Sequence, residues 1–124
     1  MPTYDHRAPS YQDRLAALPD SEIQRLTDYL MAAIFATAGK CDHQLVPIIL
    51  EQYLEKGFAV LPSNTLAARL NSCRRTICTG RKRLEKAGFI RQIGLNTDGQ
   101  YACVPLLERA DEYRARIGEV RHAA

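Results

Sequence analysis

The chain has 124 residues, 46% of them hydrophobic, which is enough for one domain with a buried core. No run of 18 apolar residues occurs and the N-terminus lacks an apolar signal region, so we expect a cytoplasmic protein that does not enter a membrane. The net charge of +3 excludes no class of partner by itself, but the charge is unevenly distributed.

Residues 61–91 hold eight basic side chains and a single acid, Glu85, which gives this segment a charge of +7. The remaining nine basic and 13 acidic residues give −4. A basic patch on a mildly acidic body is the electrostatic footprint of a nucleic-acid binder. A solvated basic helix with no partner would have the same composition.

The N-terminal part is predicted to be an arm. Residues 1–9 carry two prolines and no hydrophobic periodicity, so we expect an arm over residues 1–19, with a short helix after Ser10. No linker or internal repeat divides the rest of the chain, so residues 20–124 are expected to form a single domain.

The first long helix is predicted after Pro19. Asp20 or Ser21 can cap its N-terminus, and Gly39 supplies its end. Apolar residues at helical spacing are expected to form its buried face: Ile23, Leu26, Leu30, Ala33 and Ile34.

A second helix is predicted in QLVPIILEQYLEKG, residues 44–57. Pro47 fits only in its first turn, because no intrahelical donor is lost there. Gly57 is expected to end the helix, and FAVLP (residues 58–62) to form a short extended link. The expected buried residues of this helix are Leu45, Ile48, Ile49 and Tyr53.

Two helices joined by a tight turn are predicted next. The first covers residues 63–70, with Ser63 as its candidate cap, and the second covers about residues 74–87, with Gly88 after its end. Asn71 suits the turn, because asparagine tolerates the left-handed conformation.

A hairpin and a final helix complete the chain. Two apolar-rich runs in residues 89–104 flank the turn cluster at residues 96–99. An amphipathic helix follows at about residues 105–118. The expected fold class is therefore mainly α with a small β-hairpin.

The helix at residues 74–87 has two different faces when residues are placed about 100° apart. The expected core side holds Cys73, Ile77, Gly80, Leu84 and Ala87. The opposite side holds Arg75, Cys78, Thr79, Lys82 and Lys86, with Arg74 and Arg83 beside it. Only Glu85 could balance these charges at helical spacing, so the layout favours an external polyanion.

The outward residues are expected to divide between bases and phosphates of double-stranded DNA. The N-terminal part of such a helix enters the major groove most deeply, so Arg74, Arg75, Cys78 and Thr79 are predicted to contact bases. An arginine bound by two hydrogen bonds to guanine contributes about 1–3 kcal/mol of discrimination. The residues predicted to contact phosphates are Lys82, Arg83 and Lys86.

The stretch LPSNTLAARLNSCRRTICTGRKRLEKAGFIRQIG, followed by DGQYACV, resembles the winged helix-turn-helix superfamily of bacterial regulators, which includes GntR- and MarR-type repressors. The resemblance implies a winged helix-turn-helix with flanking N- and C-terminal helices. It assigns a positioning helix to residues 63–70, a recognition helix to 74–87, a wing to 89–104 and a C-terminal helix to 105–118.

The sequence departs from that pattern at several positions. Cys73 stands where a capping serine is usual, and Gly80 and Arg81 stand where small and leucine-like residues are usual. Glycine inside a helix costs about 1 kcal/mol against alanine, which suggests that another segment packs closely at Gly80. Asp98 at the wing tip would be repelled by phosphate, so we expect Arg91, assisted by Gln92, to make the wing contact. Asn96 and Thr97 are weaker candidates.

Four cysteines raise the question of metal or redox chemistry. Cys41, Cys73, Cys78 and Cys103 are expected to be free thiols, because their spacing does not match a structural zinc site. Oxidant sensing by Cys73 and Cys78 stays open as an alternative.

Enzyme activity finds no support in the sequence. No glycine-rich phosphate loop, nucleophile elbow or HExxH motif occurs. His6, His43 and His122 are expected at the surface, in the arm, a loop and the tail. We therefore expect a non-enzymatic protein without metal or cofactor, and the residues identify no small-molecule effector.

The sequence thus predicts a small transcriptional regulator, a repressor that occupies its operator as a homodimer. The alternatives are a phage or plasmid replication-initiation or partition protein, and a winged-helix adaptor between proteins. A repressor should protect one palindrome, a plasmid-type binder should prefer tandem repeats, and an adaptor should bind with little dependence on salt.

Overall fold

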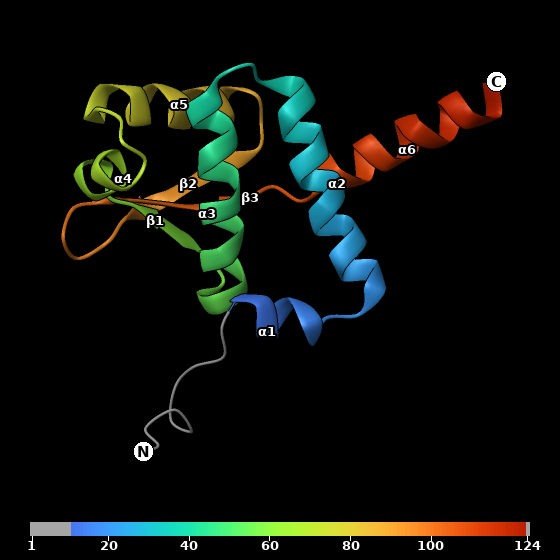
Figure 1. Ribbon diagram of the computed structural model, residues 1–124, viewed down its shortest axis with the longest axis horizontal. Coiled ribbons are helices and arrows are strands. Elements are labelled where there is room, and N and C mark those ends of the chain that lie inside the picture. The colour runs from blue at the N-terminus through green and yellow to red at the C-terminus, as the bar shows by residue number, and fades with distance from the viewer. Residues whose placement is uncertain (1–10, 124) are drawn as a thin grey trace.

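The computed structural model describes residues 11–123, which form helices around a small antiparallel sheet (Figure 1). The predicted class, mainly α with a β-hairpin, is confirmed. Of the predicted arm (residues 1–19), residues 1–10 lie outside the described residues. The elements are α1 (Tyr11–Ala16), α2 (Asp20–Ala36), α3 (Lys40–Lys56), β1 (Ala59–Leu61), α4 (Ser63–Arg69), α5 (Arg74–Lys86), β2 (Ile90–Leu95), β3 (Tyr101–Pro105) and α6 (Glu108–Ala123).

The short helix expected after Ser10 is α1, and it packs on the rest of the protein. Leu15 in α1, and Leu18 just after it, are half-buried against the core. Residues 11–18 are therefore part of the folded body.

The sheet has three strands in the order β1-β3-β2, one more than the predicted hairpin. The segment expected to be an extended link supplies β1, in which Ala59 lies opposite Cys103 and Leu61 opposite Tyr101. The sequence did not reveal this pairing because β1 is only three residues long and its partner is distant in the chain.

The predicted hairpin is confirmed as β2 and β3, with a bulge between Gln92 and Gly94. Its turn is built by Asn96, whose Oδ1 accepts hydrogen bonds from the backbone N–H groups of Asp98 and Gln100. Gly99 adopts a φ of 74°, which favours glycine at this position.

Helix α2 ends earlier than predicted, and of its predicted buried face only Ile34 is exposed. The chain leaves the helix at Thr37, which is extended, and Gly39 is instead the N-cap of α3. Pro19 is the N-cap of α2, with no side-chain capping bond, so the caps expected from Asp20 or Ser21 are wrong.

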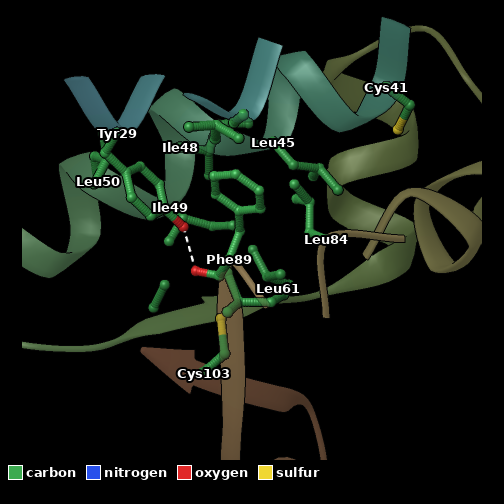
Figure 2. Close-up of a cluster of buried hydrophobic side chains, with 14 of the residues drawn as sticks. Tyr29, Cys41, Leu45, Ile48, Ile49, Leu50, Leu61, Leu84, Phe89 and Cys103 are labelled. Carbon is green, nitrogen blue, oxygen red and sulfur yellow. Dashed lines mark hydrogen bonds between the residues drawn. The ribbon is translucent and has the colours of Figure 1, made fainter. Parts of the chain in front are cut away.

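The buried face of α2 includes Tyr29, which was not among the predicted buried residues, and leaves out Ile34, which is 48% exposed. Tyr29 is fully buried, and its hydroxyl donates a hydrogen bond to the backbone carbonyl of Phe89 (Figure 2). Their rings meet edge to face, 5.5 Å apart. The contact adds Tyr29 to the predicted face, of which Leu26 and Ala33 are buried and Ile23 and Leu30 half-buried.

Helix α3 begins four residues earlier than predicted, at Lys40, so Pro47 lies inside the helix instead of in its first turn. The additional first turn contains Cys41 and Asp42, which are both buried. Leu45, Ile48 and Ile49 are buried as expected (Figure 2), whereas Tyr53 is half-buried. Gly57, with a φ of 85°, ends the helix as predicted.

Helix α6 begins and ends later than predicted and lies across α2. Arg25 pairs with Asp111 at 2.9 Å, and Arg114 pairs with Asp28 at 2.6 Å. Beyond this crossing the helix projects away from the other elements (Figure 1).

No helix within residues 11–123 combines the length and apolar character needed to cross a bilayer.

Candidate nucleic-acid interface

Helices α4 and α5 are joined by the tight turn that the sequence predicts. Asn71 has a φ of 51°, and the N–H of Ser72 donates to the carbonyl of Ala67 at 2.8 Å. Pro62 is the N-cap of α4, so the capping role expected of Ser63 is wrong. The turn fixes where α5 begins, at Arg74.

The inner face of α5 is buried largely as predicted. Ile77, Gly80 and Leu84 are buried, and Ala87 is half-buried. A Cβ atom at Gly80 would lie 2.9 Å from Oδ1 of Asp42 and 3.3 Å from Sγ of Cys41. The first turn of α3 is therefore the segment that packs closely on this glycine.

Cys73 is exposed, contrary to its predicted place on the core side. It is the N-cap of α5, and its extended backbone (φ −112°, ψ 159°) takes it off the helical wheel used for that prediction. Its Sγ lies 3.1 Å from Oγ1 of Thr76, and this hydrogen bond lowers the pKa of the Cys73 thiol. The thiolate therefore forms at a lower pH than in a free cysteine.

The outward side of α5 carries four exposed cationic residues, which we call the cationic face: Arg74, Arg75, Lys82 and Lys86. None of the four forms an ion pair within 4.0 Å with any acid of the described chain. Their charges therefore remain available to a partner.

The two uncharged residues predicted to contact bases are less available to a partner than the arginines are. Thr79 is exposed, but its hydroxyl donates to the backbone carbonyl of Arg75 at 2.9 Å. Cys78 is half-buried, with its Sγ 3.5 Å from Oγ of Ser63. Thr79 can therefore present its methyl group to a partner, and Cys78 a partly covered sulfur. The arginines are the stronger hydrogen-bond donors on this side.

Glu85, the one acid of α5, is turned toward the sheet. Its Oε2 accepts a hydrogen bond of 3.1 Å from the hydroxyl of Tyr101. Arg81 lies over the ring of Tyr101, with its guanidinium carbon 4.3 Å from the ring centre. Glu85 is thereby held away from the cationic face, and Arg81 packs at the edge of the core as its position predicted.

Arg83 differs from the other basic residues of α5 because it has an internal partner. Its Nη1 lies 3.5 Å from Oδ1 of Asp42, a fully buried carboxylate whose oxygens have no hydrogen-bond donor among the described residues. A buried carboxylate needs a counter-charge. Arg83 is 54% exposed, so it can still approach a partner, but its charge is shared with Asp42.

Sequence reasoning missed this role of Asp42, because the residue was expected to lie in a loop before α3. Its neighbour His43, also expected in a loop at the surface, lies in the first turn of α3 and is half-buried. Nε2 of His43 is 2.6 Å from the carbonyl of Thr37. The side chains of His6 and His122 lie outside the described part.

The hairpin presents Arg91 as an exposed residue of β2, opposite Val104 of β3. Arg91 forms no ion pair with a described acid. Asn96 is occupied by the turn and by Gln100, to which its Nδ2 donates at 2.9 Å. Arg91 is therefore the better placed of the hairpin candidates.

A hollow of about 680 Å³ separates the hairpin from α4 and α5. Arg74 and Arg81 reach it from α5, Asn64 from α4, and Gln92 and Gln100 from the hairpin. Because Arg74 also belongs to the cationic face, the hollow continues that face toward the hairpin.

The cysteines and acids do not assemble a metal site in the described chain, where no group of three or more potential ligands occurs. All four cysteines are free thiols. Cys103 is fully buried, and this burial raises the pKa of its thiol to about 12.

No protein family, curated protein or solved structure matches this chain in comparisons with known proteins.

Proposed function

We propose that the protein binds double-stranded DNA in a sequence-specific manner, with α4 and α5 as the helix-turn-helix and β2–β3 as the wing. The observation that carries the proposal is the cationic face of α5. Its four charges are exposed and lack acidic partners within the described chain, while Glu85 is held by Tyr101. Uncompensated like charge on one helix is unfavourable unless a polyanion relieves it.

The buried side of α5 supports the proposal by giving the helix a fixed attachment. Ile77 and Leu84 anchor it in the core, and Gly80 allows it to approach α3 closely. A helix held in this way can present long cationic side chains to the major groove at a defined angle.

The residues have distinct roles in this proposal. Arg74 and Arg75, at the N-terminus of α5, contact base edges, and Cys78 and Thr79 add apolar contact beside them. Lys82, Lys86 and Arg91 contact phosphates, and Arg83 contributes less because Asp42 shares its charge.

The biological role that fits these features is a small transcriptional regulator, a repressor that acts as a homodimer on an operator with inverted symmetry. No cofactor is assigned to it. Its expected location is the cytoplasm, where chromosomal DNA is accessible.

Selection of bound sequences from random DNA duplexes, repeated at two salt concentrations, tests the function. A regulator is expected to enrich one inverted repeat, and total binding should fall steeply at the higher salt. Enrichment of tandem repeats would favour a replication or partition protein. Failure to enrich any duplex at low salt would reject the proposal.

A further inference from the structure

The hollow between the hairpin and helices α4 and α5 has the volume of a small-molecule site. Its volume, about 680 Å³, lies within the range of about 300–1,000 Å³ that is typical of ligand pockets. It lies at the end of the molecule away from α6 (Figure 1). Its lining is mostly polar, so a polar ligand suits it better than a hydrophobic one.

Arg81 is the lining residue that most strongly indicates a ligand. Its guanidinium carbon lies 4.3 Å from the ring centre of Tyr101, which also lines the hollow. Its Nε is buried without a hydrogen-bond partner, and Arg81 forms no ion pair with an acid of the described chain. A buried donor without an acceptor is unfavourable. Because the ring contact holds the guanidinium in place, its N–H groups are arranged to bind an anion from outside the chain.

Arg74 supplies a second guanidinium to the same hollow. It is exposed and, like Arg81, has no acidic partner within residues 11–123. The two arginines are seven residues apart in α5, which places them on the same side of the helix. Together they match a phosphomonoester, which carries a charge of about −2 at neutral pH. A single carboxylate would leave one of the two charges uncompensated.

The hairpin side of the hollow indicates what else the ligand carries. Asp98 is the one acid among the lining residues, and it is exposed in the β2–β3 turn. Its carboxylate repels a second phosphate but accepts hydrogen bonds from hydroxyl groups. Gln92 and Asn64 add amide groups, which both donate and accept. The lining therefore suits one phosphate with several hydroxyl groups better than it suits the continuous phosphate backbone of DNA.

We propose that this hollow binds a small sugar phosphate, with its phosphate at Arg74 and Arg81 and its hydroxyl groups toward Asp98. Arg74 is also the residue predicted to contact a base edge, so the ligand and DNA compete for one guanidinium. A bound sugar phosphate then lowers the affinity for DNA. This competition, but not the ligand site itself, rests on the proposed function.

Isothermal titration calorimetry of the full chain without DNA tests the site, with ribose 5-phosphate as the probe at constant ionic strength. Saturable binding is expected, with a Kd of about 1 mM or lower. Inorganic phosphate should bind at least about 3-fold more weakly because it lacks the hydroxyl groups, and ribose should not bind. No saturable binding up to about 10 mM ribose 5-phosphate would overturn the proposal. Equal affinity for ribose or for inorganic phosphate would overturn it as well.

Two pairs of neighbouring residues separate the hollow from the general charge of α5. Arg74→Gln and Arg81→Gln should each weaken ribose 5-phosphate binding at least about 10-fold. Arg75→Gln and Lys82→Gln are the matched controls, because they remove the same charge at the next residue, outside the hollow. Each control should change the affinity less than about two-fold. Equal losses within either pair would overturn the site.

Circular dichroism and urea unfolding establish that each variant is folded. Arg81→Gln removes the contact with Tyr101 and is the substitution with the greater risk to the fold. Arg74→Gln alters an exposed side chain, so the comparison with Arg75→Gln decides the question even if Arg81→Gln does not fold.

Fluorescence anisotropy with a selected duplex tests the competition and separates it from the proposed function. Ribose 5-phosphate at ten times its Kd should weaken duplex binding by about 10-fold relative to sodium chloride at equal ionic strength. Equal duplex binding in the two solutions would overturn the competition. A chain that binds ribose 5-phosphate but no duplex contradicts only the DNA-binding proposal, and one that binds duplex but no ribose 5-phosphate contradicts only the ligand site.

Discussion

The cationic face of α5 and the crossing of α2 with α6 differ in how their charged side chains are paired. Around α6, Arg25, Arg109 and Arg114 each pair with an acid of the same chain, and the surface left over is apolar. On α5 the four residues of the cationic face have no such acids in the described chain, only Arg83 has one in Asp42, and the apolar residues face the core. Where α2 and α6 cross, arginines are paired with acids of the same chain, whereas on the outward side of α5 four cations stand together without one.

Charge reversal on α5 is expected to have the largest effect. Arg75→Glu combined with Lys82→Glu should reduce DNA affinity at least about 100-fold, because one base contact and one phosphate contact become repulsive. Anisotropy titration at low salt measures the loss. Lys56→Glu, at the exposed C-terminal end of α3, is the control and should change affinity less than about two-fold. Equal losses in the two proteins would mean that net charge, rather than the face, controls binding.

Glycine-to-alanine substitutions should change the free energy of unfolding in opposite directions in α5 and α6. Gly80→Ala should destabilise the protein by about 1–3 kcal/mol, because its Cβ would press on buried Asp42 at 2.9 Å. Gly118→Ala should stabilise it by about 0.5–1 kcal/mol, because the added methyl meets no neighbour and alanine favours the helix. Urea unfolding of both variants at one protein concentration measures this difference. Stabilisation by Gly80→Ala would contradict the close packing of α5 on α3.

Substitutions at Arg83 and Lys86 should distinguish an effect on protein stability from an effect on DNA affinity. Lys86→Gln should lower the slope of log affinity against log salt by about 1 and leave unfolding unchanged. Arg83→Gln should lower that slope less. It should also destabilise the fold, because the buried Asp42 loses its counter-charge. The loss should be only about 1 kcal/mol, because Arg83 is half-exposed and solvent partly screens the pair. Titrations at several salt concentrations, together with urea unfolding, measure both quantities. Identical behaviour of the two variants would show that the Asp42 contact has no energetic role.

The smallest expected effect is a difference in reactivity between two cysteine thiols. Cys73 is exposed and its hydrogen bond to Thr76 lowers its pKa, so it should react with iodoacetamide at neutral pH before the buried Cys103. The rate of Cys73 alkylation should reach half its maximum at a pH below the ordinary thiol pKa, and it should fall as the pH is lowered further. Peptide mass analysis identifies the modified residue, and first modification at Cys103 would contradict this assignment.

The elements of the α4–α5 unit could be predicted because local signals and tertiary packing agree there. Asn71 and Gly88 adopt the left-handed backbone that the turn and helix end require, and Ile77 and Leu84 mark the buried face of α5. The outward positions of Arg75, Lys82 and Lys86 follow from the same helical period.

The remaining features depend on contacts between distant parts of the chain, which periodicity does not reveal. Tyr29 became the centre of the α2 core through Phe89, 60 residues away. Asp42 was buried against Arg83, and β1 paired with β3. Cys73 was misplaced because a helical wheel does not apply to an extended N-cap residue.

The salt dependence of affinity for a selected duplex tests the central claim most directly. The account predicts tight binding at low salt that weakens as salt rises, with a log–log slope of about −3.5 for each subunit, as expected when roughly four phosphates are neutralised. A slope near zero, or a slope that does not change when Lys82 and Lys86 are both replaced by glutamine, would contradict it.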